Sequence, residues 1–208
     1  MSSVVQVAPP RARLNELPLA QTRGKECMWY VILTEAMLFA CLFASYYYLG
    51  NNKDRWSQET PPVLWFALVL LAILLTSSAI LFYGEKQLKK HNYRAARLAV
   101  WVTILFGLGF LALQGYEYYS DWMNLAPYND SYGSIFYTIT SLHAAHVCAG
   151  LLMLGFLGVM PRYGETPRTP HKPYETIAMY WHFVDAVWVV IVTFLYVIPH
   201  FQRLAHVG

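Results

Sequence analysis

The sequence predicts an all-α integral membrane protein built as a bundle of five transmembrane helices. Its 208 residues are 57% hydrophobic and only 13% charged, whereas soluble domains carry about a quarter charged residues. The charge-poor stretches form long apolar runs, and a helix satisfies its own backbone polar groups in lipid. The net charge of +3 is small and gives no indication of nucleic-acid binding.

Five runs are long enough to cross the membrane, because about 30 Å of hydrocarbon takes roughly 20 helical residues. Polar, turn-rich linkers such as "GNNKDRWSQETPP" and "SDWMNLAPYND" separate them. We expect a cytoplasmic N-terminal tail over residues 1–26, one transmembrane domain over 27–199 and an outer tail over 200–208. The predicted spans are 27–49, 63–84, 98–119, 132–160 and 177–199.

Lysine and arginine predict the orientation, because cytoplasmic loops carry an excess of these residues. With the N-terminus inside, twelve of the 15 Lys and Arg fall on the inner side and three on the outer side. We therefore expect the N-terminus inside and the C-terminus outside. The inner set is Arg11, Arg13, Arg23, Lys25, Lys86, Lys89, Lys90, Arg94, Arg97, Arg162, Arg168 and Lys172.

Ionisable side chains within the spans are the first candidates for function, because a charge in hydrocarbon is costly and usually faces the bundle interior. A helical rise of about 1.5 Å per residue places four of them at a similar depth in the inner half of the membrane and a fifth near the midplane. We expect these groups to pair with one another across helices. The four are Glu35, His146, His182 and Asp185, and the fifth is His143.

Glu35 leaves two interpretations open. It stands next to Ala36 and Met37, and an apolar setting favours a neutral carboxyl unless a histidine holds the charge. A structural hydrogen bond and a proton-handling role fit the residue equally well. Glu117 differs, since its depth places it close to the outer surface, within reach of water or an interfacial partner. The secondary candidates are Gln114, Glu117, Trp181 and Trp188.

The histidines also raise the question of metal or haem. His143 and His146 form an HxxH pair on one helix face, and either one with His182 would suit the axial positions of a haem b. Intramembrane polar groups pair structurally more often than they coordinate. We therefore predict no metal and no cofactor on this chain.

The motifs in order resemble subunit III of the haem-copper terminal oxidases, the family of cytochrome c and quinol oxidases. "YWHFVDAVW", residues 180–188, looks like the last-helix signature of that family. "SLHAAHV", residues 141–147, is similar to its HGLHV segment, with Ala144 and Ala145 replacing Gly-Leu. "LTEAMLFACLFASYYY", "QGYEYY" and "YGSIFYTITSLHAAHV" resemble its first core helix and its third and fourth helices.

The resemblance covers roughly residues 25–198 and implies an accessory subunit with no active site of its own. Such a subunit binds the side of catalytic subunit I and contacts other oxidase subunits. Haem and copper are then expected on the partners, with phospholipid in a cleft of this subunit. It also implies support for proton uptake into subunit I. The expected location is the bacterial inner membrane, as a multi-pass protein.

The resemblance implies that the polar residues of the family correspond to Glu35, to the pair His143 and His146, and to the pair His182 and Asp185 in this sequence. The two additional N-terminal helices of the long mitochondrial form are not matched, so the chain resembles the five-helix bacterial type. The other wall of the lipid cleft would then come from another chain.

Several alternatives stay open at this point. Within the family they are subunit III of a quinol oxidase and an accessory protein of a nitric oxide reductase. From different classes they are a bis-histidine haem b cytochrome and a proton channel. A transporter is less well supported, because the spans show neither broken helices nor an internal repeat.

Overall fold

The structure is a computed structural model that describes residues 12–52, 64–121, 131–159 and 172–201. Five helices are long and apolar enough to cross a membrane, which confirms the predicted five-helix, all-α membrane fold. The last helix continues through a π-helical turn to Phe201. The elements are α1 (Ala12–Asn52), α2 (Leu64–Lys89), α3 (Tyr93–Asp121), α4 (Ser131–Val159), α5 (Lys172–Val192) and the π-helical turn η1 (Thr193–Val197).

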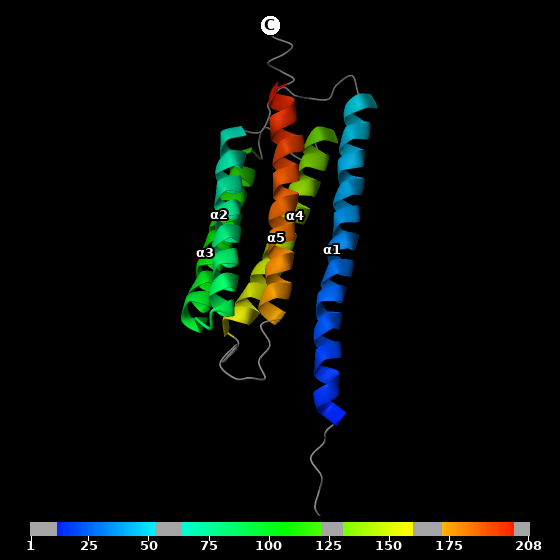
Figure 1. Cartoon of the computed structure of the whole chain (residues 1–208). Helices are drawn as coiled ribbons and strands as arrows, with labels where there is room; N and C mark the ends of the chain where they lie inside the picture. The colour runs from blue at the N-terminus through cyan, green and yellow to red at the C-terminus, as the bar shows by residue number, and fades with distance from the viewer. Residues whose placement is uncertain (1–11, 53–63, 122–130, 160–171, 202–208) are drawn as a thin grey trace, which may run out of the picture.

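Helix α1 begins at Ala12, inside the segment 1–26 that was expected to be a tail. Most of the predicted linkers and the C-terminal tail lie outside the described residues. Within the described part, the first and last helical residues stand at opposite ends of the bundle (Figure 1).

Helix α5 is the centre of the bundle, since it contacts α1, α2 and α4. Helices α2 and α3 form the most extensively packed pair on one side, and α4 packs against both α3 and α5. Helix α1 stands at the opposite edge, where it contacts α4 and α5 (Figure 1). Any residue of α5 that faces inward therefore meets side chains from several helices.

The packing of α2 follows a heptad pattern. Its buried residues are separated alternately by three and four positions, the spacing that keeps one seam facing a neighbouring helix. Several of them are small, which lets helices approach closely in a membrane. These residues are Ala67, Leu70, Leu74, Ser77, Leu81, Gly84 and Leu88.

A tight turn reverses the chain between α2 and α3. His91 adopts a φ of 61°, the left-handed conformation common just after a helix C-terminus. The N–H groups of His91 and Asn92 donate to the carbonyls of Leu88 and Gln87, each at 3.0 Å. The Asn92 side chain then accepts from the Ala95 N–H at 3.4 Å and caps the start of α3. The turn fixes α2 and α3 as an antiparallel pair.

Trp181 fills the space where α2, α3, α4 and α5 meet, and its side chain is fully buried. Glycines on two neighbouring helices make room for the indole. A Cβ at Gly107 would lie 2.8 Å from Trp181 Cη2, and a Cβ at Gly150 would lie 2.9 Å from Trp181 Cε3. The indole N–H donates to Ser77 Oγ at 3.0 Å. Trp181 therefore ties α5 to α2, α3 and α4 at one level.

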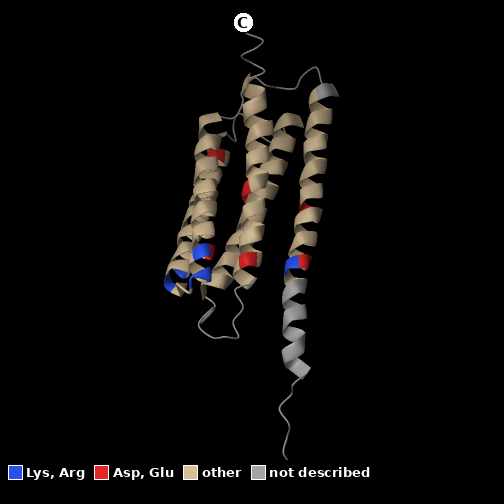
Figure 2. Cartoon of the chain, viewed as in Figure 1, with Lys and Arg blue, Asp and Glu red and all other residues tan. Residues whose placement is uncertain are grey.

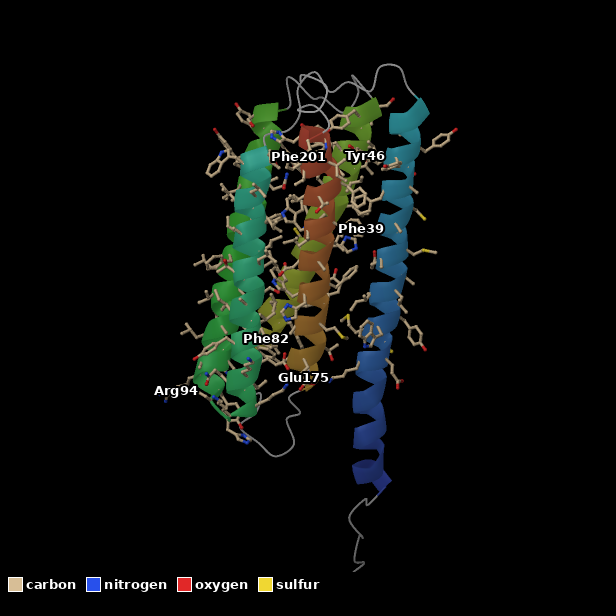
Figure 3. All side chains as sticks on the ribbon, turned by 45° about the horizontal axis from the view of Figure 1, so that its top comes forward. Phe39, Tyr46, Phe82, Arg94, Glu175 and Phe201 are labelled. Carbon is tan, nitrogen blue, oxygen red and sulfur yellow. The ribbon has the colours of Figure 1, made fainter. Side chains whose placement is uncertain are left out.

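Helix α1 is held by a much narrower contact. Its buried side chains recur every seven residues, at Ile32, Phe39 and Tyr46. Figure 3 shows Phe39 and Tyr46 directed from α1 toward the rest of the bundle. In the apolar 18-residue stretch of α1, only 6% of the helix is buried inside the protein, compared with 50% for the corresponding stretch of the last span. Most of the α1 surface in this chain is thus available to lipid or to another protein.

Gly107→Ala tests the packing around Trp181. The added methyl group would overlap Trp181 and Leu151 Cδ2, the latter at 2.7 Å, and overpacking of this kind lowers the free energy of unfolding by about 1–3 kcal/mol. Reversible unfolding of the chain in mixed micelles measures the change. Gly109→Ala is the matched control, because no atom lies within 4 Å of its Cβ position. Equal losses in the two variants would contradict the packing argument.

Candidate functional site

The predicted polar layer exists as two separate pairs rather than one cluster. Glu35 of α1 meets His146 of α4, with 2.8 Å between Glu35 Oε2 and His146 Nε2. His182 of α5 instead meets Ser78 of α2, through a hydrogen bond between Nδ1 and the Ser78 hydroxyl. The two pairs thus lie on different helix interfaces, one at the edge helix and one within the main bundle.

A hydrogen bond joins Glu35 and His146, and the second nitrogen of the imidazole limits how it can be made. His146 Nδ1 lies 2.7 Å from the carbonyl oxygen of Leu142, and a carbonyl only accepts, so Nδ1 carries a hydrogen. Nε2 then either accepts from a neutral Glu35 carboxyl or donates to a Glu35 carboxylate. Either arrangement is neutral overall, which lowers the cost of placing both groups in the membrane. The Phe39 ring packs edge-on against the imidazole, with 5.3 Å between ring centroids.

The expected pairing of His182 with Asp185 is wrong. Asp185 is 3% exposed, and neither carboxyl oxygen has a hydrogen-bond partner in the described part of the protein. The imidazole of His182 uses Nδ1 for Ser78, while Nε2 is buried and also unpartnered among these residues. The two side chains share a face of α5, but His182 takes its hydrogen bond from Ser78 of α2.

His143 is packed as an aromatic ring. It is fully buried and stacks on Trp188, with 4.8 Å between ring centroids, while Phe110 meets it edge-on at 5.8 Å. Neither ring nitrogen has a hydrogen-bond partner within the described helices, and the same holds for the indole nitrogen of Trp188. The predicted polar pairing of His143 is therefore replaced by stacking between α3, α4 and α5.

Glu117 was expected close to the outer surface, within reach of water or an interfacial partner, and the structure gives it partners inside the bundle. Its side chain is buried, with 5% exposure. Gln114 Nε2 donates to it at 2.8 Å, and the Tyr196 hydroxyl donates at 3.3 Å. Tyr196 belongs to η1. No sequence signal pointed to Tyr196, because its hydrogen bond to Glu117 joins residues that are 79 positions apart.

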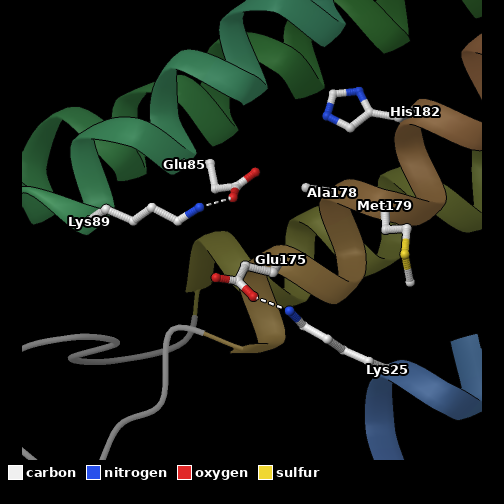
Figure 4. Close-up of a pocket in the computed structure, with 7 residues that line it drawn as sticks. All are labelled: Lys25, Glu85, Lys89, Glu175, Ala178, Met179 and His182. Atoms are coloured by element: carbon white, nitrogen blue, oxygen red, sulfur yellow. Dashed lines mark hydrogen bonds and ion pairs between the residues drawn. The ribbon is translucent and has the colours of Figure 1, made fainter. Parts of the chain in front are cut away.

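A pocket of about 440 Å³ opens between α1, α2 and α5 at the end of the bundle that carries the basic residues (Figure 4). Lys25 of α1 forms an ion pair with Glu175 of α5. Lys89 meets Glu85 within α2 at 2.7 Å. His182, Ala178 and Met179 complete the lining. The spacing of four residues between Glu85 and Lys89 could have been read from the sequence, whereas the contact between α1 and α5 could not.

The hydrogen bonds of His146 argue against this residue as an axial haem ligand. An axial ligand needs an imidazole nitrogen that is free to bind iron, but both nitrogens of His146 are engaged. Within the described ranges, no group of three or more His, Cys, Asp or Glu side chains is arranged to hold a metal ion. The cysteines Cys27, Cys41 and Cys148 are unpaired and exposed on the helices.

Comparison with known proteins identifies the family. The sequence model of the family described as cytochrome c oxidase subunit III matches residues 19–200. The chain belongs to the cytochrome c oxidase subunit III family. It is 33% identical over 172 residues to a protein from Thermostichus vulcanus named cytochrome c oxidase subunit 3, covering 82% of this chain and 85% of the relative.

Two further relatives extend the comparison. A cytochrome c oxidase subunit 3 from Bacillus subtilis (strain 168) is 35% identical over 173 residues, with 81% of this chain and 83% of the relative covered. A cytochrome bo(3) ubiquinol oxidase subunit 3 from Pseudomonas putida is 31% identical over 175 residues, with 82% and 83% covered. Subunit III proteins named for a cytochrome c oxidase and for a ubiquinol oxidase therefore resemble this chain to a similar extent.

In this member of the subunit III family, the residues that carried the resemblance are divided between core and interface. Trp181 and Trp188 of the last-helix signature are fully buried, and Asp185 is nearly so. The histidines of the HxxH segment point to different surroundings, since His143 stacks in the core and His146 binds Glu35 of the edge helix.

A double-mutant cycle tests the Glu35–His146 contact. Glu35→Ala and His146→Phe should each destabilise the chain, with a coupling free energy of about 0.6–1.7 kcal/mol, the range from the average to the largest value that such cycles give for interhelical hydrogen bonds in a membrane. Unfolding of the single and double variants in mixed micelles gives the value. Thr34→Ala combined with His146→Phe is the control, because the Thr34 hydroxyl donates to its own helix, at 2.8 Å from the Val31 carbonyl. A coupling near zero for Glu35 would refute the contact.

Proposed function

We propose that this chain is the accessory, non-redox subunit III of a respiratory haem-copper oxidase that reduces O2 with electrons from cytochrome c. The observation that carries the proposal is the family match over residues 19–200, nearly all of the helical bundle. Membership of the family places the chain in a multi-subunit oxidase. Within that complex, subunit III binds the side of catalytic subunit I, stabilises it and supports its proton uptake.

The proposed orientation has the N-terminus in the cytoplasm and the C-terminus outside, with the chain in the bacterial inner membrane. It is supported by the charges of the described helices, since Figure 2 shows their Lys and Arg gathered at one end of the bundle. Cytoplasmic ends of membrane helices carry this excess. The pocket between α1, α2 and α5 then opens toward the cytoplasm, the side from which an oxidase takes its protons.

Haem and copper are proposed to reside on the partner subunits. This chain contributes a largely exposed α1, with apolar side chains such as Leu33, Met37 and Leu38 on its surface. Such a surface suits contact with phospholipid or with a neighbouring transmembrane subunit. The paired glutamate and histidine beneath it connect α1 to α4 and give that surface a fixed position.

Purification of a tagged chain from its native membrane in mild detergent tests the assignment. Haem-copper subunit I should accompany the chain, seen by mass analysis and by the haem absorption spectrum, while the separated chain should be colourless. Haem on the separated chain would support the bis-histidine alternative and overturn the proposal. Recovery without any haem-copper subunit would also contradict it.

The quinol oxidase alternative rests on the resemblance to the Pseudomonas putida protein. Oxygen consumption by the purified complex with reduced cytochrome c, compared with a reduced quinol, distinguishes the two donors. Oxidation of cytochrome c supports the proposal, and oxidation of quinol alone would replace it with the alternative.

Glu35→Ala should leave the oxidase assembled but make its activity decay faster during turnover, because the variant loses the hydrogen bond between Glu35 and His146 and the only carboxyl at that contact. The measurement is the time course of oxygen consumption under continuous turnover. Thr34→Ala, at the neighbouring position of α1, is the control and should decay at the normal rate. Normal decay in the Glu35 variant would exclude a role for this residue in sustained proton uptake.

A further inference from the structure

A polar seam runs from the pocket into the membrane interior between α2 and α5. On α5, Glu175, His182 and Asp185 are separated by seven and three residues, so they lie on one face of the helix. On α2, Glu85 and Ser78 are seven residues apart and also share a face. The two helices are in contact. The two polar faces meet because Ser78 is hydrogen bonded to His182.

The seam has an open mouth and a closed end. At the mouth, Glu85 and Glu175 line the pocket, and His182 lies farther in on the same lining (Figure 4). Asp185 is ten residues beyond Glu175, which corresponds to about 15 Å along the helix. Between them, the Ser78 hydroxyl bonds His182. Ser78 also interacts electrostatically with Asp185, although neither carboxyl oxygen makes a hydrogen bond within the described part of the protein.

Asp185 is the unusual member of this arrangement. A buried carboxyl is normally hydrogen bonded, since an unsatisfied group in an apolar setting is costly. Here both carboxyl oxygens are buried and lack a hydrogen-bond partner among the described residues. A carboxylate in that position would be strongly destabilised, whereas a carboxyl that binds a proton becomes neutral.

We propose that Asp185 is a proton-binding site that is filled from the pocket at the basic end of the bundle through the seam between α2 and α5. One proton enters at Nε2 of His182, which has no hydrogen-bond partner within the described helices. The Ser78 side chain turns from His182 toward Asp185 to make the hydrogen bond that the last transfer needs. The proton on Nδ1 passes to Ser78 Oγ, and the Ser78 hydroxyl gives its own proton to a carboxylate oxygen of Asp185. Only the proton position changes, and Asp185 ends neutral.

The charged and titratable groups around the seam suit this path. Glu85 and Glu175 are acidic groups at the mouth, with Lys89 and Lys25 paired to them. From α4, His143 stacks on Trp188, three residues beyond Asp185. The ionisable residues of α3 lie toward its ends: Tyr93, Arg94, Arg97, Tyr116, Glu117, Tyr118, Tyr119 and Asp121.

This site belongs to the chain itself and does not depend on which oxidase the chain serves. It is distinct from the Glu35–His146 pair, which lies at the interface of α1 with α4. Failure to recover an oxidase with the chain would overturn the proposed function and leave the proton site at Asp185 to be judged by its own measurement.

Infrared spectroscopy of the full chain in lipid nanodiscs provides that measurement. The wild-type chain should show the C=O stretch of a protonated, buried carboxyl that is absent from Asp185→Asn. Asp185→Glu should move the band rather than remove it, and it guards against a folding defect in the first variant. The opposite result is that Asp185→Asn keeps every protonated-carboxyl band of the wild type, at every pH at which the chain is folded. That result would overturn the proposal.

Exchange of the same band from H2O to D2O tests the route. His182→Phe and Ser78→Ala should retain the band and slow its exchange by roughly 100-fold, the lower end of what a positioned proton-transfer group contributes. Thr76→Ala is the matched control, since its hydroxyl is on the exposed side of α2 and donates to the Ala72 carbonyl at 2.7 Å. Unchanged exchange in both seam variants would show that the carboxyl is structural and is not filled through His182.

Discussion

The packing of Trp181 is the constraint on which the rest of the bundle depends. A fully buried indole needs space on every side, and glycines at positions 107 and 150 provide it on α3 and α4. Its N–H also needs an acceptor, which Ser77 of α2 supplies. Because lipid offers no hydrophobic drive for helix association, close packing and interhelical hydrogen bonds of this kind hold membrane helices together. Four helices are thereby fixed at one level.

The fixed part of the bundle sets the surroundings of the polar residues on α5. Trp181 and Trp188 face the core, so Asp185, which stands between them in sequence, is carried into the interior too. His182 is next to Trp181 in the chain and is directed toward α2, where Ser78 meets it. The helix thus combines close packing on one side with a polar face on another, and the polar face leads from the pocket to a buried acid.

Helix α1 is attached to the bundle by fewer contacts than the other helices. It buries one residue in seven, and its polar contacts with the bundle include the Glu35–His146 hydrogen bond and the Lys25–Glu175 ion pair. A narrow apolar stripe with these polar contacts gives modest attachment within the chain, and it leaves a wide apolar surface for partners. This is the arrangement expected of a helix that completes its packing in an assembly, consistent with a subunit of a larger membrane complex.

The sequence by itself determined the five helices and the family, because hydrophobic run length is set by membrane thickness and the signature residues are contiguous in the chain. The constant helical rise also predicted that Glu35 and His146 lie at a similar level, and their contact agrees with this. Only the tertiary structure decided the partners of the ionisable groups. His146 rather than His143 meets Glu35, Ser78 rather than Asp185 meets His182, and Glu117 is buried beneath Tyr196. Depth along a helix follows from counting residues, whereas the direction in which a side chain points depends on helix rotation, which is fixed by packing between helices.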